Sequence, residues 1–545
     1  MPDILADTKW KRFLLLAVSG VLTGLTLVFP RVGFLEWLTL VPMALFLLLE
    51  ADSDGRRCRS MYGYGFFFFM CFYVVVFHWF VNLYPLDFID GMTAWAAIAV
   101  VLAGCVGLSA FQALFGGLMF VFTRLLFRTR VFTRYRILRP FAIAGLYTIY
   151  EWTQNLGWWG VPWGRLPLGQ SEYIVGLQTA SLFGSYFVTF LIVLVNAAIA
   201  YAIVERKALR AMTVTVASVL VLQYGVGTAL YFIPNDSEET VRVAAVQGNI
   251  SSNEKWSVDS KQRTFEVYEE YTLKAAQNGA DIVVWPETAL PYTITEGNGY
   301  GQFCSELARK AGVTILVGAF SRGENFTEQY NSIICVLPDG SFHETVYSKQ
   351  RLVPFGEFVP MRNLFQVLIP PLAELVMTSE DILAGDDSEV IVLDGANVGC
   401  LVCFDSIYDY LARDSVNDGA QIICLSTNDS WFTDSAALYM HNAQAQLRAI
   451  ENGRYVVRSA NTGISTVISS KGTVLEELPP LMDGMVEYDV SVNTHRTLYS
   501  RIGNFIVSAL AIAFAVVFVY DITIRIKCRF EEKSDGNVNK NRKVY

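Results

Sequence analysis

Three residues that follow apolar, strand-like runs carry the side chains needed for nucleophilic acyl chemistry. Glu287 follows DIVVWP, Lys349 follows HETVYS, and Cys403 ends the run VGCLVC. A cysteine attacks as its thiolate, so it needs a base that takes the proton and a positive charge that stabilises the anion. A carboxylate and an ammonium supply both functions. The three residue types together indicate attack of a thiol on a carbonyl carbon.

A second cysteine, Cys400, lies in the same run, three residues before Cys403. In a strand, residues at this spacing point to opposite faces, so the two thiols do not form a close redox pair. A zinc site would need two further ligands, and His343 and His441 lack the paired spacing of zinc ligands. We therefore expect Cys400 to be a core residue, Cys403 to be the nucleophile, and the protein to use no metal and no cofactor.

Each of these residues also has an ordinary structural explanation. Taken alone, Glu287 fits a turn carboxylate, a lone lysine is normally a solvated charge, and most single cysteines are small buried hydrophobes. Lys349, however, opens the segment KQRLVPFGEFVP, whose prolines and glycine restrict the backbone. The base for Cys403 is then either a histidine, His343 or His441, or the carboxylate of Glu287.

The surrounding elements predict a layered α/β domain. Strand-like runs lie at 241–247, 281–286, 314–320, 331–338, 343–349, 389–393, 398–403 and 421–427, with helical runs at 261–277 and 302–311, before a helix from Ser435 to Gly453. Four further strand-like runs follow that helix, at 455–461, 464–470, 473–478 and 485–490. Because α/β sheets place functional side chains where strands end, this fold accounts for the positions of the three candidate residues.

The rest of the chain is too apolar for an ordinary soluble protein, since hydrophobic residues make up 53% of it and charged residues 17%. Apolar runs of about membrane-spanning length lie near 13–29, 34–50, 62–82, 94–123, 175–203, 211–232 and 503–522, and a weaker run begins at Pro140. We expect about eight transmembrane helices in an α-helical bundle, joined to the α/β domain.

Basic residues cluster before the first run, in the loops after the second, fourth and fifth of the strong runs, and after the last. Short cytoplasmic loops carry such an excess of positive charge, and all these loops share one side only if the weak run also crosses the membrane. The predicted division is a membrane domain with seven helices (1–235), an external domain (236–497), a transmembrane helix (498–524) and a cytoplasmic tail (525–545).

The motifs resemble those of a known family. WPET with Glu287, KQRLVPFGEFVP with Lys349 and Glu357, and CLVCFD with Cys403 resemble, in that order, the Glu-Lys-Cys triad of the nitrilase superfamily. With its apolar spans, the chain resembles the membrane-embedded branch, the apolipoprotein N-acyltransferases. The resemblance covers nearly the whole chain, including Lys255-Trp256 and the segments 151–170, 427–435 and 441–465.

This resemblance implies a nitrilase-like αββα sandwich that faces the periplasm from the bacterial inner membrane. Cys403 would take an acyl chain from a phospholipid as a thioester, and the α-amine of a diacylglyceryl-cysteine on an apolipoprotein would accept it. Glu287 would act as acid and base. Glu357 would orient Lys349, or else be a loop carboxylate that accepts backbone hydrogen bonds. A monomer that binds no nucleic acid is expected.

Aromatic residues near these motifs could form a lipid-facing rim, because aromatic rings suit the membrane interface. The candidates are Trp256, Phe358 and Trp431, although isolated aromatic residues are more often core or anchor residues. Phe404 and Asp405 stand where tyrosine and glutamate are common in the family, which leaves the hydrogen bonds of those two positions open.

Several polar residues near the motifs have two explanations. Arg454 and Arg458 either hold a headgroup or a carboxylate, or pair with Glu451 on the domain surface. Asn428 and Asp429 are expected to shape a loop near the nucleophile.

Two other functions remain open. A membrane-tethered amidase or nitrilase would use the same triad with water as the acceptor, although a small soluble substrate gives no reason for a large membrane base. A scaffold or transporter would carry ionisable groups within its spans, and these spans carry few, notably His78 and Glu151.

Overall fold

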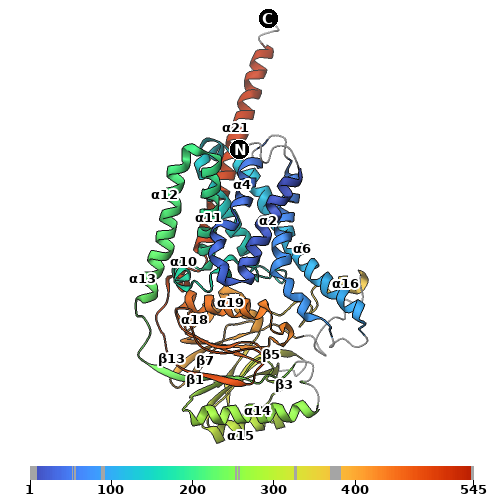
Figure 1. Ribbon diagram of the computed structural model, residues 1–545, viewed down its shortest axis with the longest axis vertical. Coiled ribbons are helices and arrows are strands. Elements are labelled where there is room, and N and C mark those ends of the chain that lie inside the picture. Colours follow the sequence, from blue (N-terminus) through green and yellow to red (C-terminus); the bar gives the residue numbers. More distant parts are fainter. Residues whose placement is uncertain are drawn as a thin grey trace.

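The structure is a helical bundle stacked on a two-sheet sandwich. It is a computed structural model that describes residues 9–51, 53, 57–86, 92–251, 255, 258–323, 328–368 and 382–541. Figure 1 shows the bundle at the top and the sandwich at the bottom, with α21 (Phe505–Asn541) projecting from the end of the bundle that faces away from the sandwich. The predicted combination of an α-helical membrane part and an α/β part is confirmed.

The bundle contains the long apolar helices. Among the described residues, seven helical stretches have the length and composition to cross a membrane. They are α2 (Lys9–Val28), η1 to α4 (Pro30–Glu50), α5 (Cys58–Val76), α6 (Ala94–Phe127), α11 (Ser185–Val204), η5 to α13 (Arg206–Phe232) and Phe505–Arg529 of α21. They lie where the strong apolar runs predict spans.

The weak run forms α8 (Arg139–Thr153), a helix of 15 residues that packs against α11 and α21. It is shorter than the other spans, but it keeps the alternation of direction along the bundle. With α8 included, the ends of α4, α6 and α11 lie at the end of the bundle away from the sandwich, where the basic loops follow them.

One predicted span is wrong at its start. The apolar run at 175–203 is broken into α9 (Ile174–Leu177), α10 (Ala180–Phe183) and α11. Gly184 separates α10 from α11 with φ of 80°, and a Cβ there would lie 2.8 Å from the ring of Tyr499. The break therefore depends on the glycine backbone and on a close approach by a distant residue.

The sandwich consists of two mixed sheets. The first has the order β13 (Gly484–Ser491), β1 (Thr240–Gln247), β2 (Ile282–Val284), β4 (Thr314–Arg322), β5 (Gln329–Val336) and β6 (Phe342–Ser348), with β3 (Leu290–Thr293) paired to β4. The second has the order β12 (Val474–Leu478), β11 (Ser465–Ile468), β10 (Val456–Ala460), β9 (Ile422–Thr427), β8 (Ala396–Val402) and β7 (Val390–Leu393). Twelve of these strands follow the predicted runs, whereas β3 has no predicted counterpart.

Helices cover both outer faces of the sandwich. The first sheet packs on α14 (Val258–Gln277) and α15 (Gly299–Ala311), and the second packs on α18 (Asp409–Asn417) and α19 (Ala436–Asn452). Figure 1 places α14 and α15 at the bottom and the α18–α19 layer between the sheets and the bundle. Cys400 lies between the two sheets with Cys335 and Cys424, which confirms that it is a core residue.

The α18–α19 layer joins the sandwich to the bundle. Its apolar side chains belong to the same core as the bundle helices. Hydrogen bonds cross the junction to the irregular segment that follows α8: Tyr408 Oη donates to the Gly160 carbonyl (2.8 Å), and Gln444 Nε2 donates to the Pro162 carbonyl (3.0 Å). The sandwich is thus held on the bundle through α19 and the turn before α18.

Candidate active site

The structure brings Glu287, Lys349 and Glu357 into one buried cluster. Glu287 follows β2, Lys349 follows β6, and Glu357 lies in the loop eight residues later. Lys349 Nζ donates to Glu287 Oε1 and to Glu357 Oε1, each at 3.0 Å. Glu357 Oε2 also accepts from the backbone N–H of Val353 at 2.8 Å. Glu357 therefore has both expected contacts, one with the lysine and one with its own loop.

The charge of Lys349 is fixed by this arrangement. The side chain is 1% exposed, and burial by itself would lower the pKa of the ammonium. The negative charges of Glu287 and Glu357 outweigh that effect and hold the pKa well above its ordinary value. Lys349 is therefore a permanent buried cation at the end of β6.

Asn331, on β5, completes the cluster and was not identified from the sequence. Its Nδ2 donates to Glu287 Oε1 (2.7 Å) and to Glu357 Oε1 (2.9 Å), the same two oxygens that Lys349 contacts. Each of the two donors therefore contacts both carboxylates. We call this ring of four hydrogen-bonded groups the closed square. No local motif marks Asn331, because its partners lie 44 and 26 residues away along the chain.

The other oxygen of Glu287 faces the end of β9. Glu287 Oε2 accepts from the backbone N–H of Asn428 at 2.9 Å. Behind the carboxylate, Lys255 Nζ donates to Thr288 Oγ1 at 3.1 Å and lies 3.5 Å from the Glu287 carbonyl oxygen. Burial lowers the pKa of Lys255 to about 7, against a weaker opposing effect of the Glu287 charge. Lys255 was part of a matching motif, but the sequence alone gave it no role.

Cys403 lies directly after β8, at the first residue of η7 (Cys403–Ile407), with φ of 48°. The charges of Glu287 and Lys349 both act on its thiol. Desolvation and the charge of Glu287 raise the pKa of Cys403 well above its ordinary value, and Lys349 opposes them. The resting residue is therefore a thiol, and it needs a base before it can attack.

Asp405 reaches its partners although it is one methylene shorter than glutamate. Its Oδ1 accepts from the backbone N–H of Arg351 (2.8 Å), and its Oδ2 accepts from Tyr347 Oη (2.9 Å) and the Val402 N–H (3.1 Å). These bonds tie the loop after Lys349 to the turn that carries Cys403. Phe404 packs edge-on against Tyr408.

The predicted pairing of the two arginines with Glu451 on the domain surface is wrong, whereas a carboxylate is the partner of Arg458. Arg458 is buried and pairs with Asp429, while Arg454 is buried and donates to main-chain carbonyls, including that of His495 at 2.6 Å. Glu451 instead forms a salt bridge with Arg448, one turn earlier on α19. Arg458 lies on the buried strand β10 and Arg454 lies just before it, so both side chains reach acceptors inside the protein.

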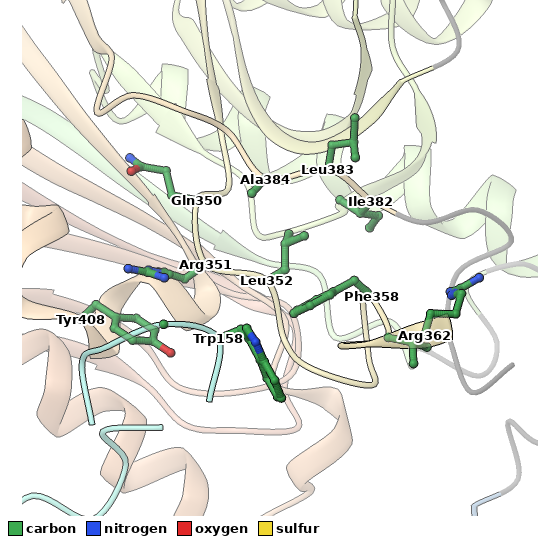
Figure 2. A pocket seen from close by; sticks show the side chains of 12 residues that line it. Trp158, Gln350, Arg351, Leu352, Phe358, Arg362, Ile382, Leu383, Ala384 and Tyr408 are labelled. Atoms are coloured by element: carbon green, nitrogen blue, oxygen red, sulfur yellow. The ribbon is translucent and has the colours of Figure 1, made fainter. Parts of the chain in front are cut away.

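A pocket of about 460 Å³ lies beside the segment that follows Lys349. Figure 2 shows its lining: Trp158 comes from the segment after α8, Phe358 comes from the loop of Glu357, and Arg351 and Arg362 lie on opposite sides. Among the expected aromatic residues, Phe358 therefore faces a cavity. Trp431 lies in the short helix η8 (Ser430–Phe432) and does not line this pocket, and Trp256 is outside the described residues.

Comparisons with known proteins give one family match for the bundle and another for the sandwich. The family described as "Apolipoprotein N-acyltransferase N-terminal domain" matches residues 19–198, and the family described as "Carbon-nitrogen hydrolase" matches residues 242–499. An apolipoprotein N-acyltransferase of Gloeobacter violaceus is 30% identical over 84% of this chain and 84% of its own. The chain belongs to the apolipoprotein N-acyltransferase family.

Two further members of this family align over almost the full length. The one from Bradyrhizobium diazoefficiens is 30% identical over 94% of this chain and 95% of its own. The one from Geobacter metallireducens is 28% identical over 95% of this chain and 96% of its own. The alignments include the bundle as well as the sandwich, so the likeness is not confined to the hydrolase-like half.

Replacing Asn331 with aspartate tests the closed square. The substitution keeps the shape of the side chain but replaces an N–H donor with a third acidic group beside Glu287 and Glu357. We expect the rate of acyl transfer to fall by about tenfold or more, because a displaced or neutralised base loses most of its catalytic contribution. The measurement is the steady-state rate of the purified variant in detergent.

Asn278→Asp is the matched control for this variant. Asn278 also donates its amide to a carboxylate, that of Glu487 at 2.9 Å, but on the exposed surface. Its replacement should leave the rate unchanged. Equal rates for Asn331→Asp and the wild type would show that Asn331 does not support the cluster.

Lys255 should make stability depend on pH. Between the folded pKa of about 7 and the ordinary value of 10.5, the unfolded chain binds a proton that the folded protein does not. Stability therefore rises with pH across this window, and below it the folded protein bears the full cost of the buried ammonium. Lys255→Met removes that cost, so its unfolding free energy should exceed that of the wild type below the window. As the pH rises through the window, this excess should shrink by about 1.4 kcal/mol per pH unit.

Thermal unfolding of both proteins in detergent at several pH values measures this difference. Lys274→Met, on the exposed face of α14, is the control and should show no such trend. A difference between Lys255→Met and the wild type that stays constant with pH would contradict the assignment.

Proposed function

We propose that this protein transfers an acyl chain from a phospholipid to the N-terminal α-amine of a diacylglyceryl-cysteine on an apolipoprotein. The observation that carries the proposal is the thiol of Cys403 in the combined field of Glu287 and Lys349, in a chain that belongs to the apolipoprotein N-acyltransferase family. Cys403 is the proposed nucleophile, Glu287 the proposed acid and base, and Lys349 the proposed electrostatic stabiliser.

In the first step, Glu287 takes the proton of the Cys403 thiol, and the sulfur attacks the ester carbonyl of the phospholipid. The negative charge that develops on the carbonyl oxygen is stabilised by the Lys349 ammonium. The C–O bond then breaks, Glu287 returns the proton to the departing alcohol, and a lysophospholipid leaves. The enzyme is left with a thioester on Cys403 and an ionised Glu287.

In the second step, the neutral α-amine of the acceptor attacks the thioester carbonyl. Glu287 takes a proton from the attacking nitrogen, the C–S bond breaks, and the proton passes to the sulfur. The products are an amide on the acceptor and the starting thiol. Throughout both steps, Glu357 and Asn331 hold Lys349 and Glu287 in place, since they share the same hydrogen-bonded square.

The helical bundle favours the proposal that the acyl donor is a lipid and that the acceptor is linked to lipid. The pocket beside the catalytic loop has apolar walls that include Trp158 from the membrane half and Phe358 from the sandwich. Arg351 and Arg362 at its sides provide positive charge for a phosphate group. Phe358, Trp431 and Trp256 are the proposed lipid-facing rim.

We place the protein in the bacterial inner membrane as a monomer, with residues 236–497 in the periplasm and the ends of the chain in the cytoplasm. The positive charge of the loops after α4, α6 and α11 supports this orientation, because such loops stay on the cytoplasmic side. The hydrolase alternative, in which water accepts the acyl chain, is not favoured by the family assignment over both halves of the chain.

Removal of the thiol tests the proposal directly. Incubation of the wild type with phospholipid should add the mass of one acyl chain to Cys403, and a diacylglyceryl-cysteine peptide should then gain that mass. Cys403→Ala should give neither adduct nor product, because no other group is proposed to attack the ester. Intact-mass spectrometry and digestion locate the adduct.

Cys400→Ala is the matched control, since Cys400 is buried between the sheets three residues earlier. It should keep the adduct and most of the rate. Full peptide acylation by Cys403→Ala would refute the assignment of the nucleophile.

A further inference from the structure

A second buried cluster lies behind Cys403 and takes no part in the steps above. It consists of His441 on α19, Asp429 after β9 and Arg458 on β10, all of them buried. His441 Nδ1 lies 2.9 Å from Asp429 Oδ1, and Arg458 pairs with the other oxygen of the same carboxylate. The carboxylate and the guanidinium thus fix the orientation of the imidazole ring, as outer hydrogen-bond partners do for other functional histidines.

The other nitrogen of the ring faces the main chain of the nucleophile. His441 Nε2 lies 3.2 Å from the Cys403 carbonyl oxygen and 3.0 Å from Ser406 Oγ. The Ser406 hydroxyl donates to the same carbonyl at 2.8 Å. His441 therefore acts on the backbone of Cys403, and this contact differs from that of a histidine that takes the proton of a thiol.

The backbone of Cys403 needs such support. Its φ of 48° lies in the left-handed region, which residues with a Cβ rarely adopt and which costs free energy unless the surroundings enforce it. Asp405 accepts from the Val402 N–H at 3.1 Å, in the peptide that joins Leu401 to Val402. His441 and Ser406 contact the carbonyl on the other side of Cys403. The two sets of contacts lie on both sides of Cys403 and so hold the direction of its Cα–Cβ bond.

The carboxylate of Asp429 also contacts a residue near the sulfur. Asp429 Oδ1 accepts from Thr427 Oγ1 at 3.1 Å. Burial raises the pKa of the Cys403 thiol, and Thr427 opposes that effect. One carboxylate therefore contacts both the His441 ring and a side chain that acts on the thiol.

We propose that His441, oriented by Asp429 and Arg458, is a positioning residue that aims the Cys403 thiol at the acyl donor. This inference rests on the proposed function, because it assigns His441 an effect on the acylation step. His441 is not the base, and it contacts neither the donor nor the acceptor. Its contribution is to the rate constant of acylation, and the binding of phospholipid does not depend on it.

His441→Phe tests the proposal. The phenyl ring keeps the packing against Trp163, whose ring centroid lies 5.6 Å away, but it removes both nitrogens. We expect the rate constant of acyl-adduct formation to fall by about tenfold to a hundredfold, since small misplacements of reacting groups cost that much. The phospholipid KM should stay near that of the wild type. His441→Gln, which restores one amide donor toward the carbonyl, should recover part of the rate.

The amplitude of adduct formation separates positioning from a simple loss of folded protein. Misfolding lowers the fraction of enzyme that acquires an acyl group, whereas mispositioning lowers the rate constant and leaves that fraction unchanged. His343→Phe, on the edge strand β6, is the matched control and should behave as the wild type. A wild-type rate constant for His441→Phe would overturn the proposal, and so would a loss confined to the amplitude.

Alkylation of Cys403 by iodoacetamide distinguishes a failure of this proposal from a failure of the proposed function. If the wild type forms no acyl adduct, the acyltransferase assignment fails, but the alkylation rate still reports the placement of the thiol. That rate, followed by digestion and mass spectrometry, should be lower in His441→Phe than in the wild type and His343→Phe. Equal alkylation rates in all three proteins would refute the role of His441 independently of acyl transfer.

Discussion

The site depends on the ammonium of Lys349, which is buried beside two carboxylates. Transfer of such a charge out of water costs several kcal/mol, and removal of one partner from a buried ion pair typically costs about 3–5 kcal/mol. The contacts with Glu287 and Glu357 offset that cost and fix three side chains from two separate segments. In the proposed mechanism, the raised pKa of Lys349 keeps its ammonium available to stabilise an oxyanion, and the raised pKa of Cys403 makes attack depend on proton transfer to Glu287.

The same segments connect this chemistry to the membrane half. Helix α19 carries His441 toward the nucleophile on one side and packs into the core of the bundle on the other. Before α18, the turn that begins at Cys403 ends at Tyr408, which donates to the Gly160 carbonyl in the segment after α8. The proposed nucleophile therefore lies in the layer that contacts the bundle, which suits the proposed donor and acceptor, both anchored in lipid.

The apolar runs and the strand periodicity predicted most of the fold because these are local patterns, and the resemblance of the ordered motifs to a known family made Glu287, Lys349 and Cys403 the candidate site residues. The predictions that failed involve contacts between distant segments. Asn331 escaped notice since an asparagine at the start of a strand carries no distinguishing pattern, and the main-chain partner of Arg454 was missed because His495 lies 41 residues away. The break at Gly184 depends on the ring of Tyr499, which comes from a part of the chain beyond the sandwich.

The central claim is that the acyl group passes through Cys403, and a single-turnover chase tests it most directly. The enzyme is first loaded with an isotopically labelled acyl chain from phospholipid, and the diacylglyceryl-cysteine peptide is then added with unlabelled phospholipid. The account predicts that label leaves Cys403 at least as fast as turnover and appears as an amide on the peptide. Label that stays on Cys403 while unlabelled product forms, or that leaves as free fatty acid at a rate independent of the peptide, would contradict it.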